Sequence, residues 1–154
     1  PPSSFKNKLF GFENGDKILA GQLGGDFVLP RDSNRKLVFL AGGIGITPFR
    51  SMIKYLLDKR ETRDIVLFYS AKSDDEIAYR DLFAEAQCKI GFRPKYVIGN
   101  LITEELIKNE VPDYIERDFY ISGPEAMVNA FKKILLRMGV SRFNITTDYF
   151  PGFV

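Results

Sequence analysis

A chain of 154 residues, 45% of them hydrophobic, is long enough to enclose one apolar core, and its net charge is only +2. Its 22 basic residues are scattered without a long basic run, which argues against nucleic acid as a partner. The sequence has no histidine and one cysteine, Cys88. These counts exclude an intrachain disulfide, a four-cysteine iron–sulfur cluster, a zinc site of the usual His/Cys type and a histidine-based catalytic triad, and we expect no metal site.

The first thirty residues differ in pattern from the rest. Residues 17–23 and 26–29 have the composition of two short strands around Gly24-Gly25, and residues 14–16 are typical of a turn. The polar stretch 30–35 predicts a boundary. The sequence starts without methionine and without signal-peptide character, which we interpret as a processed product or a part of a longer protein.

From Lys36 onward the pattern predicts that strands and helices alternate. The expected strands cover residues 36–40, 65–69, 94–98, 118–122 and 143–146, and the expected helices cover 47–59, 75–87, 103–109 and 124–138. Nearly continuous apolar strands indicate a parallel sheet covered on both faces, so the predicted fold class is α/β, a Rossmann-like doubly wound sheet of five parallel strands. Ligands bind such sheets at the carboxyl ends of the strands, which makes three segments candidate sites: 41–48, 69–75 and 122–127.

The first candidate segment is a glycine cluster that follows an apolar strand. Gly42, Gly43 and Gly45 let backbone approach backbone or a ligand. Thr47 suits an N-cap and Pro48 the first helical position, and a helix N-terminus suits a diphosphate. The third glycine of the G-x-G-x-x-G fingerprint is missing, so a plain strand-to-helix turn and a nucleotide site both stay open here.

The second candidate segment carries opposite charges. An acidic residue after the second strand would favour NAD by bonding the ribose hydroxyls, whereas a cation would favour the extra phosphate of NADP. Lys72 favours NADPH, whereas the cluster Asp74-Asp75-Glu76 favours NADH. Because the acidic residues outnumber the lysine, the sequence slightly favours NADH. The acidic cluster could equally cap the next helix, and Tyr79 could stack on adenine or cover a helix surface.

The third candidate segment, Ser122 to Met127, again joins a strand to a helix. Gly123 allows close approach and Pro124 starts the helix. The Ser122 hydroxyl could touch a ring over the strand ends, but no base lies near it in sequence to make it a nucleophile. The aromatic-rich end, residues 146–154, is either a cap on the core or a stacking surface for a planar cofactor.

Together these motifs resemble the pyridine-nucleotide-binding half of the ferredoxin–NADP⁺ reductase superfamily. Residues 41–49 are similar to its glycine-rich turn ending in Pro-Phe, residues 122–127 to its Cys-Gly-Pro stretch with a following methionine, and residues 147–150 to its acidic-x-Phe element. Residues 1–32 resemble the end of the family's flavin-binding barrel, and residues 33–154 would then be the NAD(P)-binding domain. The longest weakly polar run, 37–49, is too short to cross a membrane.

The resemblance implies an NAD(P)H-dependent flavin oxidoreductase that passes a hydride from NADH or NADPH to FAD and electrons onward to a one-electron acceptor, such as an iron–sulfur or haem protein. It implies catalytic roles for Ser122, Thr47 and Asp148. The cofactor-binding residues that it implies are Gly42, Gly43, Gly45, Ile46, Thr47, Pro48, Ser70, Lys72, Asp75, Tyr79, Ser122, Gly123, Pro124, Met127 and Phe150, with Ser3 and Ser4 near the FAD pyrophosphate.

Two departures from the family pattern keep alternatives open. The early barrel strands and their Arg-x-Tyr-Ser/Thr motif are missing, so a flavin barrel or another N-terminal domain is an expected partner, and activity of this chain alone is open. The family often has cysteine where Ser122 stands. A non-catalytic nucleotide-binding or interaction domain that retains the fold, or a flavodoxin-like module that binds FMN, are the alternatives. The expected location is the cytoplasm, or the cytoplasmic domain of a larger protein.

Overall fold

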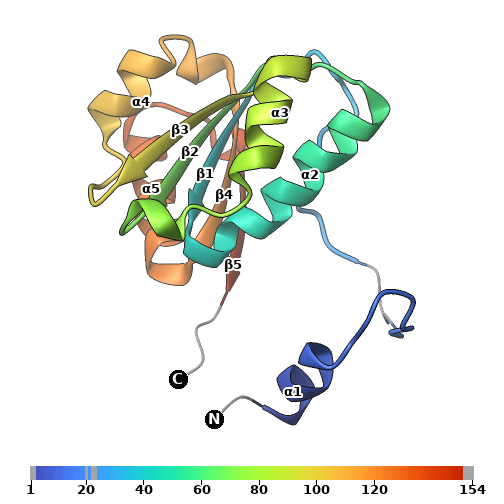
Figure 1. Cartoon of the computed structure of the whole chain (residues 1–154). Helices are drawn as coiled ribbons and strands as arrows, with labels where there is room; N and C mark the ends of the chain where they lie inside the picture. The colour runs from blue at the N-terminus through green and yellow to red at the C-terminus, as the bar shows by residue number, and fades with distance from the viewer. Residues whose placement is uncertain (1–2, 20, 22–23, 151–154) are drawn as a thin grey trace.

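A computed structural model of the chain describes residues 3–19, 21 and 24–150, and the described residues centre on one sheet of five parallel strands (Figure 1). The spatial order of the strands is β3-β2-β1-β4-β5. The strands are β1 (Leu37–Gly42), β2 (Ile65–Ala71), β3 (Arg93–Ile98), β4 (Asp118–Pro124) and β5 (Ile145–Phe150). The helices are α1 (Ser4–Phe10), α2 (Ile46–Lys59), α3 (Arg80–Ile90), α4 (Glu104–Glu110) and α5 (Glu125–Arg137). The predicted doubly wound α/β fold is therefore confirmed.

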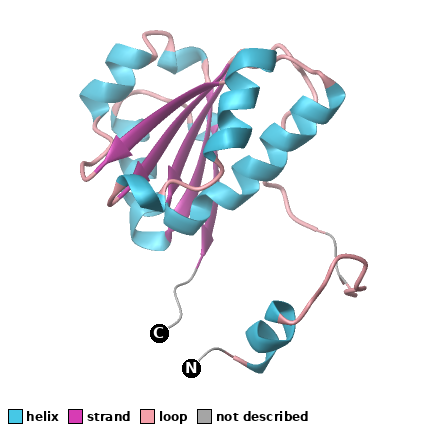
Figure 2. Ribbon diagram, in the orientation of Figure 1, coloured by secondary structure: helices cyan, strands magenta, loops and turns pink. Residues whose placement is uncertain are grey.

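Helices cover both faces of the sheet (Figure 2). The central strand β1 needs this cover because its side chains are apolar on both faces. All six of its residues are buried. Phe39 points to the face covered by α2 and α3, where its ring stacks on Phe49 of α2 with centroids 4.4 Å apart. Val38 and Leu40 point to the opposite face, among residues of α4 and α5. A strand with no solvent-facing side can be apolar throughout, which is the pattern that its sequence shows.

The helices α2 and α5 bury the apolar stripes that their sequences predict. In α5, Val128, Phe131 and Leu135 are buried at helical spacing. The helix is terminated by Gly139, whose φ of +90° is in the left-handed region. The backbone N–H of Gly139 donates to the carbonyl of Leu136 at 3.1 Å. The helix thus ends within one residue of the expected range, 124–138.

The start of α3 differs from the expected helix over 75–87. Residues 74–76 form a separate 3-10 turn, and the chain is extended at Ile77, which is 7% exposed. Tyr79 then adopts a left-handed conformation, with φ of 62°, and α3 begins at Arg80. Burial of Ile77 in the core requires an extended step between the turn and the helix. The prediction that the acidic cluster caps this helix is therefore wrong.

The described N-terminal residues contain a short helix, α1, but not the expected strands. The Ser3 side chain caps α1 by accepting from the backbone N–H of Lys6 at 3.3 Å, and every residue of α1 is exposed. The predicted strands 17–23 and 26–29 are wrong for described residues 17–19, 21 and 26–29, while residues 20, 22 and 23 lie outside the described residues. A strand is stable only when paired, and β1 to β5 pair with one another alone within the described chain.

Residues 27–29 instead pack on the α/β layers. The Phe27 ring lies 5.6 Å from that of Phe49 and 5.4 Å from that of Tyr120, measured between centroids. The Tyr120 hydroxyl donates to the carbonyl of Val28 at 2.9 Å, and Leu29 contacts the same core. The domain division at residues 32 and 33 stays a prediction.

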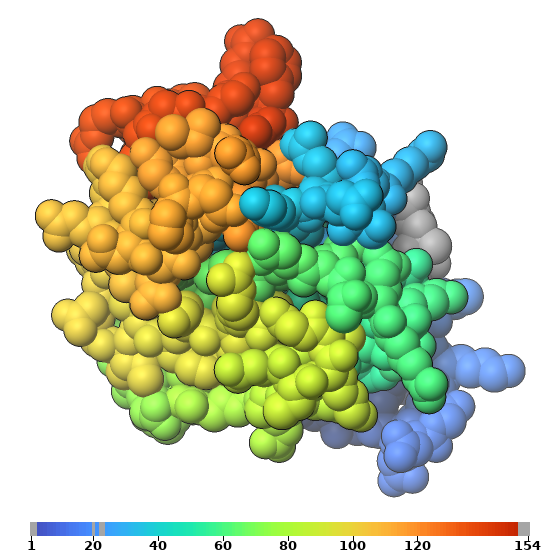
Figure 3. Space-filling view, turned by 90° about the horizontal axis from the view of Figure 1, so that it is seen from above, coloured from blue at the N-terminus to red at the C-terminus, as the bar shows by residue number. Residues whose placement is uncertain are grey.

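A network of charges joins the segments that precede the strands. Figure 3 looks onto this face, where the cyan segment near residues 32–36 lies beside the orange segment near 112–117 and the green segment near 60–64. The Arg117 side chain, 4% exposed, donates to Asp113 and to Asp64, each at 2.8 Å. Lys36 also pairs with Asp113 at 2.8 Å. Because the guanidinium is buried away from water, its charge is stabilised mainly by these carboxylates.

Candidate functional site

A groove of about 1570 Å³ runs along the carboxyl ends of the strands. It takes lining residues from the ends of β1, β2 and β4, from almost the whole of β3, from the loop after β3 and from α4, together with Glu76 and Met127. The three candidate segments predicted from the sequence all reach it. The predicted site residues that line it are Gly42, Gly43, Ser70, Lys72, Pro124 and Met127.

Packing between two turns explains two of the glycines. A Cβ at Gly45 would lie 2.1 Å from the carbonyl oxygen of Ser122, and one at Gly42 would lie 2.3 Å from Met127 Sδ. A Cβ at Gly123 would lie 2.6 Å from Met127 Cε. Glycine is therefore required at Gly45, where residues 42–45, the glycine turn, meet the backbone of residues 122–127, the serine turn, whereas at Gly42 the atoms met are the end of the flexible Met127 side chain. These contacts hold the two walls of the groove together.

Gly43 has a different role from its neighbours. Its φ is +52°, and no heavy atom of the described residues lies within 4 Å of the position of a Cβ. Its backbone faces the groove instead of packing against protein. A ligand could therefore approach the main chain closely at this residue.

The N-terminus of α2 follows this glycine turn directly. The helix begins at Ile46 with Gly45 as its N-cap, so the expectation that Thr47 is the N-cap and Pro48 the first helical residue is wrong. Thr47 Oγ1 instead donates to the carbonyl of Ile44 at 2.9 Å. A 3-10 turn, residues 43–45, leads directly into α2, and the backbone N–H of Ile46 already donates to the carbonyls of Gly43 and Ile44. The N–H groups open to an anion at this end are therefore those at the start of the 3-10 turn.

The end of β2 combines a lysine with a fixed carboxylate. The backbone N–H of Lys72 donates to Glu76 Oε2 at 3.1 Å, and both residues line the groove. The Arg80 side chain is paired with the Asp74 carboxylate, and its Cζ lies 5.0 Å from the ring centroid of Tyr96, which also lines the groove. Arg80 and Asp74 thus form an ion pair beside the segment, whereas Lys72 contacts Glu76 through its backbone N–H.

Asp75 and Tyr79 are not among the lining residues. A hydrogen bond from the Ser73 side chain lowers the pKa of Asp75. The Tyr79 ring packs edge-on against Phe83 at 6.4 Å, with the Arg50 guanidinium 5.8 Å from its centroid. These contacts place Tyr79 against α2 and α3, and the predicted cofactor roles of Asp75 and Tyr79 stay predictions.

Ser122 is completely buried at the end of β4. Its Oγ is without a hydrogen-bond partner among the described residues. On the neighbouring strands it is in register with Ala41 and with Asp148, which is partly buried. Thr47 is also partly buried at the start of α2. The three predicted catalytic residues belong to adjacent elements, but a ring could reach the serine hydroxyl only if neighbouring groups moved.

The remaining predicted residues are spread over the molecule. Ile46 is buried, Pro48 is partly buried, and Phe150 ends β5 in register with Pro124. Ser3 and Ser4 belong to the cap and first residue of α1. Residues 151–154 of the aromatic end lie outside the described residues.

The sequence analysis missed the part of the groove beyond β3. The lining residues not singled out there are Pro94, Lys95, Tyr96, Val97, Ile98, Gly99, Asn100, Leu101, Thr103, Leu106 and Glu110. The rule that ligands bind at carboxyl ends would have included those at the end of β3 and in the loop after it, but not those in the first half of the strand.

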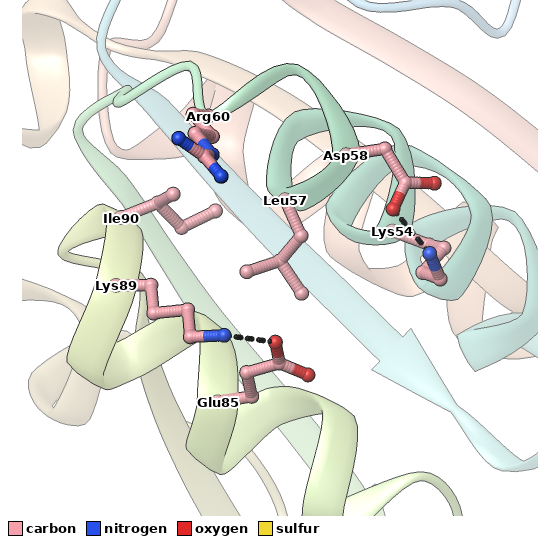
Figure 4. A pocket seen from close by; sticks show the side chains of 7 residues that line it. All are labelled: Lys54, Leu57, Asp58, Arg60, Glu85, Lys89 and Ile90. Atoms are coloured by element: carbon pink, nitrogen blue, oxygen red, sulfur yellow. Dashed lines mark hydrogen bonds and ion pairs between the residues drawn. The ribbon is translucent and has the colours of Figure 1, made fainter.

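A smaller cavity of about 390 Å³ lies between α2 and α3 (Figure 4). Leu57 and Ile90 form its apolar part, and the Lys89–Glu85 ion pair spans one side at 2.7 Å. Exposed pairs of this kind contribute little to stability. Its described lining contains none of the predicted site residues.

A doubly wound parallel sheet with a glycine turn and a groove at its carboxyl edge defines a nucleotide-binding type of domain. Residues 39–133 match the family model of the oxidoreductase NAD-binding domain, and the chain belongs to this family. The resemblance to the ferredoxin–NADP⁺ reductase superfamily is confirmed.

Two groups of relatives illustrate the comparison. One component of the Na⁺-translocating NADH-quinone reductase of Methylococcus capsulatus is 31% identical over 170 residues, which cover 99% of this chain and 41% of that protein. A flavohemoprotein of Oceanobacillus iheyensis is 29% identical over 138 residues, or 82% of this chain and 34% of that protein. The chain thus spans less than half the length of these relatives.

Solved structures share the fold. The flavohem-like FAD/NAD-binding domain of nitric oxide dioxygenase from Vibrio cholerae superposes with a TM-score of 0.72 at 23% identity, covering 84% of this chain and 56% of that one. The ferredoxin-NADP⁺ reductase of Plasmodium falciparum gives 0.64 at 21% identity, covering 82% and 57%. Among the described residues, none of the helices has the length and apolar character needed to cross a bilayer.

Proposed function

We propose that this chain binds NADH or NADPH and presents it for hydride transfer to an FAD held largely by a preceding flavin barrel. The observation that carries the proposal is the groove lined by Gly42 and Gly43, where the 3-10 turn that leads into α2 begins. Electrons would pass onward to a one-electron acceptor such as a haem or iron–sulfur protein. The relatives named as a quinone reductase component and a flavohemoprotein support this class of reaction.

The diphosphate would lie against the glycine turn. Gly43 offers its backbone without a Cβ, and the first N–H groups of the 3-10 turn that leads into α2 supply hydrogen bonds together with the positive end of the helix dipole. Gly42 and Gly45 do not touch the ligand in this proposal. Their role is to let the glycine turn pack against the serine turn, which fixes the direction of those N–H groups.

Orientation of the nicotinamide is the remaining task of this chain. The chemistry that a bound flavin supplies is the acceptance of a hydride and the release of electrons one at a time. Thr47, Ser122 and Asp148, on adjacent elements, are the residues that we propose flank the ring. Phe150, two residues further along β5, would limit the space beside it.

Binding is tested by titrating the reduced-nicotinamide fluorescence of NADH and NADPH with the purified chain and with Gly43→Glu. We expect the variant to bind at least about tenfold more weakly, because a charged side chain would occupy the diphosphate position. Gly91→Glu is the matched control. Gly91 also has a positive φ, +69°, and open space around it, but it follows α3 and does not line the groove. Equal affinities in the wild-type chain and Gly43→Glu would contradict the proposal.

The complete burial of Ser122 favours a second candidate, a nucleotide-binding domain that does not promote hydride transfer. An anaerobic visible spectrum with added FAD separates the two. Loss of the oxidised-flavin band after NADH or NADPH, faster than in a protein-free control, supports hydride transfer. Nucleotide binding with no such acceleration supports the second candidate for the chain by itself.

A further inference from the structure

We infer that Tyr120 and Arg63 form a clasp that holds residues 27–30, the connecting segment, on the α/β layers and directs the chain before it to the edge that carries the groove. The connecting segment lies between α1 and β1 and has no regular secondary structure. The inference goes beyond the proposed function, because the clasp does not depend on which nucleotide binds or on whether one is bound.

Phe27 completes a cluster of four aromatic rings. Its ring contacts those of Phe49 and Tyr120, with centroids 5.6 and 5.4 Å apart. Phe39 of β1 contacts the same two rings at 4.4 and 5.7 Å. Aromatic pairs with such separations stabilise a fold beyond the burial of their apolar surface. The connecting segment is therefore packed as part of the core on the side of α2 and α3, although it belongs to no strand.

Two side chains bind the carbonyls of the connecting segment, as a neighbouring strand would. The Tyr120 hydroxyl donates to the carbonyl of Val28 at 2.9 Å, and Arg63 Nη1 donates to the carbonyl of Pro30 at 2.7 Å. Both donors are buried, with Tyr120 and the Arg63 side chain each 6% exposed, and Glu61 holds the Arg63 guanidinium at 2.7 Å. A buried donor is costly to leave without an acceptor. Both donors therefore favour the docked position of the segment.

The anchor points give the chain a direction. Phe49 belongs to the first turn of α2, near the carboxyl ends of the strands, whereas Arg63 precedes β2 at their amino ends. Arg35 pairs with Asp118, the first residue of β4, through two hydrogen bonds. Followed backward from Arg35 to Phe27, the chain therefore runs toward the carboxyl edge. In Figure 1, α1 lies beyond the ends to which the arrowheads of β3 and β5 point. The clasp thus presents the preceding chain to the groove.

Spin-label distances in the whole chain test the clasp. One label is attached to the exposed native Cys88 on α3, and the other to Asp26→Cys, an exposed position directly before the connecting segment. We expect one narrow distance distribution without urea, and a broad, undocked component as urea is raised toward global unfolding. Tyr120→Phe keeps the ring without its hydroxyl, and Arg63→Gln removes the guanidinium. Each should raise the undocked population at a given urea concentration about fivefold, the effect of one lost hydrogen bond.

Tyr114→Phe is the matched control, because the Tyr114 hydroxyl also donates to a backbone carbonyl, that of Met138 at 3.4 Å, but packs on the opposite face of the sheet. It should keep the wild-type distribution, and thermal unfolding should show that every variant is folded. A broad distribution in the urea-free chain labelled without further substitution, or a response to fewer than both clasp variants, would overturn the inference. Tyr120 and Arg63 do not line the groove, so NADH affinity should stay unchanged. An intact clasp in a chain that binds neither nucleotide would overturn the proposed function alone.

Discussion

The glycines of the groove are constrained by different physical causes. Gly45 has an ordinary right-handed conformation, with φ of −62°, and is restricted by the backbone of the serine turn 2.1 Å from the position of its missing Cβ. Gly43 has open space and is restricted by its positive φ. The first constraint concerns packing between two turns, and the second concerns backbone conformation and access to a ligand.

We predict that Gly45→Ala lowers the free energy of unfolding by about 2–3 kcal/mol, because its Cβ would displace main-chain atoms of Ser122 rather than a flexible side chain. Urea unfolding measures this change. Gly43→Ala, whose new methyl group meets no described atom within 4 Å, should cost only about 1 kcal/mol through backbone strain. If Gly45→Ala lost no more stability than Gly43→Ala, the serine turn would be able to move aside at little cost, which would contradict the prediction.

At the scale of elements, the sequence predicted helices and strands correctly where a single local pattern determines them. The apolar run of β1 and the helical stripe of α5 are repeated patterns, and both elements formed where expected. The start of α3 was predicted too early because the burial of Ile77 and the left-handed Tyr79 depend on tertiary packing. Residues 26–29 have strand composition, but composition does not supply a partner strand.

Part of the candidate site could be predicted, because that part is also formed by local patterns. The glycine turn and the serine turn are short motifs, so the sequence located both at the groove. The contribution of Tyr96 and the loop after β3 depends on the strand order, in which β3 lies beside β2. The complete burial of Ser122 depends on the close approach of Gly45 to the Ser122 backbone, which no local motif encodes.

The end of α2 allows a stabilising change to be predicted. Arg60 has φ of 54° at the helix C-cap, where its N–H donates to the carbonyl of Leu57 at 3.1 Å. Arg60→Gly should raise the free energy of unfolding by about 1 kcal/mol, because glycine adopts this conformation without a Cβ penalty. Thermal and urea unfolding test it. Lys59→Gly, one residue earlier and inside the helix, should instead lower stability by about 1 kcal/mol, and a loss in Arg60→Gly would contradict the argument.

At the scale of the whole molecule, the charge network at the beginnings of the strands links β1, β2 and β4 (Figure 3). The Arg117 guanidinium, followed by Lys36, holds the pKa of Asp113 well below its usual range although burial acts in the opposite direction. Burial raises the pKa of Asp64, but hydrogen bonds from Arg117 and Arg93 outweigh it and the pKa is lowered. Both carboxylates therefore favour the folded state when ionised.

We predict that the free energy of unfolding falls as the pH is lowered below about 4, because the unfolded chain takes up protons there that the folded chain does not. Arg117→Leu should be less stable by about 3 kcal/mol at pH 7 and should depend less on pH in this range, since its carboxylates lose their main partner. Urea unfolding between pH 2 and pH 7, as approximate limits set by ordinary carboxyl pKa values, measures both effects. Arg31→Leu, at an exposed position, should retain the wild-type slope, and an equal slope in Arg117→Leu would refute the assignment.

The contact between the glycine turn and the serine turn has a kinetic consequence. Gly42 packs on Met127 and Gly45 on the backbone of Ser122, so two walls of the groove form one preassembled unit before any nucleotide arrives. A ligand that enters a preorganised site spends little of its interaction energy on ordering loops. Encounter should then be rapid for any dinucleotide of the right shape, and differences among nucleotides should be expressed as residence times.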